Sequence, residues 1–140
     1  MESRSTDRIP LQLSRGCVVA SIQVDLSEEV LQLFRTELLE LLHRSGARGV
    51  ILDLSGVEIL DLEDFEALRR TMAMAALMGA RTVFAGFRPG VVSALVELDA
   101  DVQEVTAALN LDDAFRLMED STEPPANEPE DAEEGEDDER

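Results

Sequence analysis

The segment VILDLSGVEILDLEDFEALRRTMAMAALMGARTVFAGF, which runs from Val50 to Phe87, decides the fold. Its opening apolar run, Val50–Leu54, predicts a short buried strand that ends at Ser55-Gly56. From about Asp61 to Met78, apolar side chains recur at helical spacing, which predicts an amphipathic helix. The β-branched and aromatic run Thr82–Phe87 predicts the next strand. A strand, a helix and a strand in this order predict two parallel strands joined by a right-handed crossover.

The residues before this segment predict a hairpin and a further helix. Apolar side chains follow a strand-like pattern from Ile9 to Leu26, and Gly16 marks a turn within it. Ser27 has the character of a helix N-cap, because its hydroxyl can accept a hydrogen bond from the first turn. The helix is expected to stop at Ser45-Gly46.

The residues after it predict a short helix that begins after Arg88-Pro89-Gly90, a last short strand around Val102–Val105 and a helix capped by Asn110. We therefore expect one α/β domain over residues 9–118, with a mixed, mostly parallel sheet, an N-terminal hairpin and about four helices. Residues 1–8 are expected to form a flexible N-terminus.

Charge excludes one large class of function. The chain of 140 residues carries 31 acidic and 12 basic side chains, a net charge of −19, whereas a nucleic-acid binder needs an excess of basic residues. Residues 119–140 hold 12 acidic residues, one arginine and only two hydrophobic residues, so we expect a disordered acidic tail. Since no run of about 18 apolar residues exists, we expect no membrane span and a cytoplasmic protein.

The usual chemistry of enzymes is missing from the sequence. The chain contains no Lys and therefore no phosphate-binding loop of the Gly-Lys type. The single cysteine, Cys17, is expected to be a buried strand residue, and no Cys or His cluster could complete a zinc site. The acids Asp61, Glu63 and Asp64 crowd one turn, where they could do acid–base work or hold a metal, but a helix N-terminus favours acids without either role. We expect no enzyme, cofactor or metal.

Several stretches together resemble the STAS domain of sulphate transporters and anti-sigma-factor antagonists. They are VILDLSGV leading through Leu60-Asp61 into a helix, then LMGARTV, GFRP, LVEL and AALNL, all between residues 50 and 111. They are most similar to the stressosome scaffold branch of RsbS and RsbR, and the opening VVASIQV from Val18 favours RsbS. The resemblance covers about residues 9–118.

The resemblance implies a domain without catalysis that binds proteins. The implied partners are other STAS proteins of the RsbR type and an RsbT-type serine/threonine kinase or an anti-sigma factor, in a homo- or hetero-oligomer. In the family, the kinase phosphorylates a Ser or Thr just after the Asp that starts the second helix. Here that Asp is Asp61 and the next residue is Leu62, so the acceptor hydroxyl is absent. A second family site falls on Ala94, with Ser93 one residue earlier and Arg88 before the helix.

This departure leaves two hypotheses for the partner-binding region formed by Ser55, Asp61, Leu62, Glu63 and Asp64. In the first, the domain binds its partners constitutively and is insensitive to phosphorylation. In the second, Glu63 and Asp64 imitate the phosphorylated state. We favour the first, because a carboxylate has one charge and two oxygens where a phosphate has nearly two charges and three oxygens.

Individual residues of these regions also have two interpretations each. Leu62 could pack under the sheet or stand exposed as an apolar anchor for a partner. Arg88 could belong to ordinary helix punctuation around Pro89 or bind a carboxylate or phosphate across an interface. A rival function is a small-ligand sensor that binds a nucleotide near Asp61, which the local acids oppose by charge repulsion. A third is an accessory domain that only supports polymer assembly.

Overall fold

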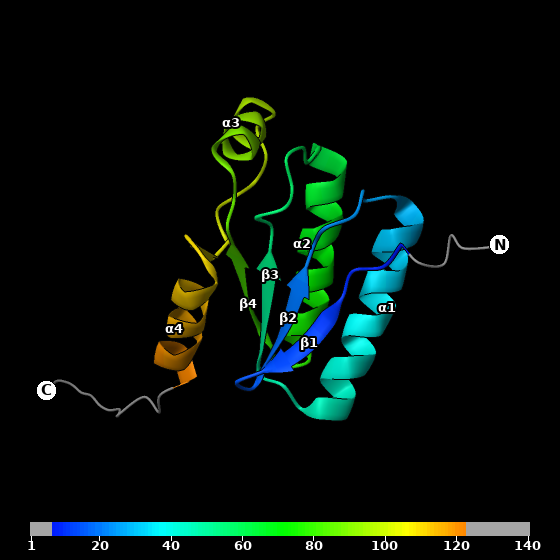
Figure 1. Cartoon of the computed structure of the whole chain (residues 1–140), viewed down its shortest axis with the longest axis vertical. Helices are drawn as coiled ribbons and strands as arrows, with labels where there is room; N and C mark the ends of the chain where they lie inside the picture. The colour runs from blue at the N-terminus through cyan, green and yellow to red at the C-terminus, as the bar shows by residue number, and fades with distance from the viewer. Residues whose placement is uncertain (1–6, 123–140) are drawn as a thin grey trace, which may run out of the picture.

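The predicted alternation of strands and helices is present, and it forms one mixed sheet with helices on both faces (Figure 1). The computed structural model describes residues 7–122 of the chain. The elements are β1 (Leu11–Ser14), β2 (Cys17–Ser21), α1 (Glu28–Ser45), β3 (Gly49–Asp53), α2 (Leu62–Leu77), β4 (Arg81–Ala85), α3 (Pro89–Glu97), β5 (Ala107–Ala108) and α4 (Leu111–Thr122). The strands lie in the order β1-β2-β3-β4-β5, with β1 antiparallel to β2 and the other neighbours parallel.

Side-chain caps start the helices where the sequence predicts them. The Ser27 hydroxyl accepts a hydrogen bond from the Val30 amide at 3.1 Å, and the Asn110 side chain accepts one from the Asp113 amide at 2.9 Å. Gly46 ends α1 in the left-handed conformation, with φ 69°, which a residue without Cβ adopts at little cost. Local sequence therefore fixes both ends of α1 and the start of α4.

Alternate residues of the strands point to two separate apolar layers. One layer packs Val18, Val50 and Leu52 against α1 and α2, where Phe34 and Leu68 are fully buried. The other layer packs Val19, Ile51 and Val83 under Ala114, Phe115 and Met118 of α4. The three middle residues of β3 have no exposed surface, so the centre of the sheet is buried on both faces.

The last strand differs from the prediction. The expected segment Val102–Val105 is a turn, and the strand is β5, which pairs with β4 two residues later. The Asp101 carboxylate accepts a hydrogen bond from the Gln103 amide at 3.2 Å, and the Val105 amide donates to the Val102 carbonyl at 3.2 Å. These local bonds stabilise a turn in a segment whose two valines favour a strand.

Both ends of the domain are described beyond the expected boundaries. Helix α4 continues to Thr122, four residues past the predicted end at residue 118. At the other end, Arg8 forms an ion pair with Glu37 of α1. The rest of the predicted tail, 123–140, and residues 1–6 lie outside the described residues.

Cys17 is a buried residue at the start of β2, 4% exposed, as predicted. Burial raises the pKa of its thiol, and the nearby Arg48 charge opposes this shift. Among the helices of residues 7–122, none is long and apolar enough to cross a membrane.

Two leucines on α1 test whether one face of this helix packs into the core. Leu38 is completely buried and Leu33 is 38% exposed. We expect Leu38→Ala to lower the free energy of unfolding by about 2–5 kcal/mol, because it removes buried apolar surface and leaves a cavity. Leu33→Ala is the matched control and should cost much less. Urea denaturation measures both, and equal losses would contradict the packing of α1.

Candidate functional site

The candidate site lies at the carboxyl ends of β3 and β4, where the chain leaves the sheet toward α2 and α3. Figure 1 shows α3 at the same end of the sheet as the start of α2. The Arg88 Nε donates a hydrogen bond to the Ser55 carbonyl at 2.9 Å, and its Nη1 lies 3.9 Å from Glu58 Oε2. These contacts join the predicted partner-binding region, which includes Ser55, to the second predicted region, which includes Arg88. Ligands and partners of open α/β sheets commonly bind at this edge.

Arg88 lies where the helix-punctuation interpretation places it, at the start of α3. Pro89 occupies the first turn of α3, as helix punctuation requires, and Arg88 is the N-cap residue without a side-chain capping bond. Its guanidinium is instead occupied by the loop between β3 and α2, through one backbone carbonyl and one carboxylate of this chain. Arg88 therefore holds the loop in place.

The loop approaches β4 closely at Ser55. Gly86 has φ 78°, and a Cβ added to it would lie 3.1 Å from the Ser55 Cβ and 3.2 Å from the Ser55 nitrogen. The Ser55 amide donates to the Asp53 carboxylate at 3.0 Å. Both backbone groups of this exposed serine are thus bonded, which fixes the loop that follows β3.

The acids at the start of α2 act first as helix caps. The Asp61 Oδ1 accepts a hydrogen bond from the Asp64 amide at 2.8 Å, and Glu63 is exposed beside it. Asp64 is half-buried, and its pKa is raised by burial and by the neighbouring Asp61 and Glu63 carboxylates. Within residues 7–122 no group of three or more His, Cys, Asp or Glu is placed to hold a metal ion. Leu62 is half-buried, so its exposure is intermediate between the buried and the exposed side chain that the sequence left open.

Ile59 is an exposed apolar residue of this region that the sequence did not single out. It is 88% exposed, whereas Val57 is 8% and Leu60 is 3% exposed. The two buried neighbours anchor the loop and leave the Ile59 side chain in solvent. The apolar run of the loop was visible in the sequence, but only the fold shows which of its members points outward.

The second predicted region lies on α3. Ser93 is exposed and Ala94 is half-buried. Val91 and Leu95 are buried, while Val92 and Val96 are 44% and 65% exposed. The outer face of α3 is therefore largely apolar, with the Ser93 hydroxyl on it.

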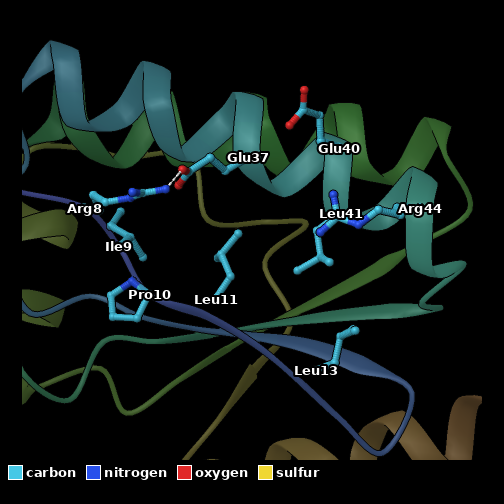
Figure 2. Close-up of a pocket in the computed structure, with 9 residues that line it drawn as sticks. All are labelled: Arg8, Ile9, Pro10, Leu11, Leu13, Glu37, Glu40, Leu41 and Arg44. Atoms are coloured by element: carbon cyan, nitrogen blue, oxygen red, sulfur yellow. Dashed lines mark hydrogen bonds and ion pairs between the residues drawn. The ribbon is translucent and has the colours of Figure 1, made fainter. Parts of the chain in front are cut away.

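The hollow beside the start of α2 disfavours an anion ligand. Its volume is about 280 Å³, and the charged residues that line it are Asp25, Glu58 and Asp64. A nucleotide phosphate would meet three carboxylates there, which opposes the nucleotide-sensor alternative. A different hollow of about 690 Å³ lies between β1 and α1, where Arg8 pairs with Glu37 (Figure 2). It contains none of the predicted site residues.

Comparisons with known proteins agree with this geometry. A family model described as STAS domain matches residues 8–123. RsbS of Moorella thermoacetica, carrying a Ser-to-Glu substitution, is 26% identical with a TM-score of 0.70, over 85% of this chain and 97% of that one. A structure described as molecular architecture of the stressosome, a signal integration and transduction hub, is 25% identical with a TM-score of 0.70, over 80% of this chain and 97% of that one.

The fold extends to more distant proteins. The anti-sigma factor antagonist SpoIIAA in its unphosphorylated form is 13% identical, with a TM-score of 0.62, over 79% of this chain and 96% of that one. This likeness concerns the fold alone. No curated protein matches the chain significantly.

The raised pKa of Asp64 predicts that Asp64→Asn increases the melting temperature by an amount that depends on pH. The folded state binds the Asp64 proton more tightly than the unfolded state, so ionisation of this carboxyl destabilises the fold as pH rises through the folded pKa. At pH 7 the variant should melt at a higher temperature than the wild type. The difference should shrink as the pH falls toward the ordinary value of 3.8, because the folded-state carboxyl is mostly protonated there.

Glu66→Gln is the matched control for this measurement. Glu66 is exposed on the same helix and removing its carboxylate changes the net charge equally. Thermal melts from pH 7 to pH 4 should show a smaller gain for this variant. An increase in melting temperature for Asp64→Asn that does not depend on pH would contradict the raised pKa of Asp64.

Proposed function

The chain belongs to the STAS domain family, and from this premise we propose that it is a non-enzymatic interaction module of stress signalling, insensitive to phosphorylation at the usual site. It assembles with other STAS proteins of the RsbR type and regulates an RsbT-type serine/threonine kinase or an anti-sigma factor. The observation that carries the proposal is Leu62, which directly follows the N-cap Asp61 at the position where the family resemblance implies a Ser or Thr acceptor. The likeness to RsbS and to a stressosome structure supports the choice of branch.

The start of α2 supports constitutive binding because its charge is permanent. Leu62 offers no hydroxyl to a kinase, and the Asp61 carboxylate already occupies the amide of Asp64. Exposed Glu63 adds a fixed negative charge one residue after the acceptor position. A phosphate switch works by adding charge at such a helix end, so a domain without an acceptor there keeps one state.

The same surface offers an apolar anchor. Ile59 stands in solvent two residues before Asp61, on a loop that the Arg88–Ser55 bond holds in place. A few such side chains carry most of the binding energy in a protein interface when a partner pocket desolvates them. We therefore assign partner binding to Ile59 together with half-buried Leu62.

Direct modification tests this proposal. After incubation with an RsbT-type kinase and ATP, the intact mass of the full chain should be unchanged. The buried residue Thr71 is 5% exposed and out of reach of a kinase, whereas Ser55 and Ser93 are exposed. Addition of a phosphate to Ser55 or Ser93 would contradict the proposal that the domain is insensitive to phosphorylation. An RsbS that retains its serine is the positive control for kinase activity.

The mimicry hypothesis predicts a different result in a binding assay. If Glu63 imitates a phosphate, Glu63→Gln should change the kinase affinity far more than Glu66→Gln does. Constitutive binding predicts small and similar effects of both variants, because each removes one exposed carboxylate from α2. Calorimetric titration with the kinase measures the two dissociation constants. A dominant effect of Glu63→Gln would favour mimicry over the proposal.

A further inference from the structure

Three arginines gather at the end of the sheet opposite the candidate site. Arg15 precedes β2, Arg48 precedes β3, and Arg81 begins β4. These strands are parallel neighbours, so their amino ends lie side by side. The Arg48 amide donates to the Gly16 carbonyl at 3.1 Å, and the Arg81 amide donates to the Arg48 carbonyl at 3.0 Å. We call these three residues the arginine cluster.

In the part of the chain that the structure describes, the arginine cluster has no carboxylate partners of the kind that Arg8, Arg69, Arg88 and Arg116 have. Arg15, Arg48 and Arg81 are exposed, and within residues 7–122 none of them forms an ion pair. The Arg15 guanidinium lies 4.6 Å from the centre of the Phe115 ring, which holds it against α4. One acid, Glu119, lines the small hollow between the three side chains. Positive charge is therefore concentrated here in a chain whose net charge is −19.

The end of α4 lies next to the arginine cluster. Met118 and Glu119 of α4 line the same hollow as the three arginines, and a Cβ added to Gly49 would lie 2.6 Å from the Met118 Sδ. Helix α4 ends at Thr122, four residues and about 6 Å of helix beyond Met118. Figure 1 shows this end of α4 at the same end of the sheet as the turn between β1 and β2. The chain thus leaves the described domain beside the cluster.

We propose that the C-terminal segment 123–140 of this same chain binds the arginine cluster. The segment has ten acidic residues and one arginine, a net charge of −9, and it begins directly after Thr122. An extended chain spans about 3.3 Å per residue, so its acids reach all three guanidinium groups. Arginine binds carboxylates through paired hydrogen bonds, which suits an acidic segment of this kind. Binding at this end leaves Ile59 and the start of α2 uncovered.

A spin label on the acidic segment tests the proposal in the full chain. The variant Ala132→Cys in a Cys17→Ala background places the label within the segment, and ¹⁵N spectra report paramagnetic broadening of each amide. We expect strong broadening at Gly16, Gly49 and Arg81 and little at Glu63, which lies at the opposite end. Broadening at these amides should weaken at about 1 M salt, where the Debye length falls to about 3 Å. The same label on a chain that retains buried Cys17 repeats the test if the background variant unfolds.

Charge-matched variants decide whether the cluster is the binding site. Arg48→Gln with Arg81→Gln should weaken the broadening, whereas Arg35→Gln with Arg70→Gln, elsewhere on the surface, should preserve it. Equal broadening in both variants, or uniform broadening over the surface, would overturn the proposal. Labelled chains mixed with ¹⁵N chains that carry no label should show no broadening. Broadening in that mixture would assign the contact to a second copy and would also overturn it.

Discussion

The burial of β3 on both faces is the constraint on which the rest of the structure depends. Val50, Ile51 and Leu52 have no exposed surface, because β2 and β4 flank the strand and helices cover both sides. A strand held in this way has a fixed register and a fixed direction. Its carboxyl end therefore delivers Ser55 to Arg88, and its amino end delivers Arg48 between the other two arginines. Two surfaces of opposite character arise from one buried strand.

The surface at the carboxyl end combines an acidic helix start with a loop that is held in place. Asp61 caps the helix start and is followed by half-buried Leu62, and Arg88 holds the loop. Fixed carboxylates provide the charge at this end. The half-buried Asp64 has a raised pKa, so part of this charge is held at a cost in stability. Destabilising charge is common where a surface is used for binding.

Sequence patterns predicted most of the fold because each local signal agreed with the whole. The turn at Gly16 and the caps at Ser27 and Asn110 occur where predicted, since they depend on side chains close in the sequence. The predicted strand Val102–Val105 was wrong because the Asp101 turn overrides the preference of its valines. The Arg88–Ser55 bond, the exposure of Ile59 and the arginine cluster depend on contacts between distant segments, which periodicity does not encode.

The central claim is that the surface around Ile59 binds a STAS partner without a phosphate. Size-exclusion chromatography with light scattering, on the full chain mixed with an RsbR-type STAS protein and no kinase or ATP, tests it most directly. The wild type and Leu77→Ser, which alters a residue 90% exposed at the far end of α2, should form the same large assembly. Ile59→Ser should lose it. A chain that stays at its monomer mass of 15.4 kDa beside the partner, or equal assembly by both variants, would contradict the claim.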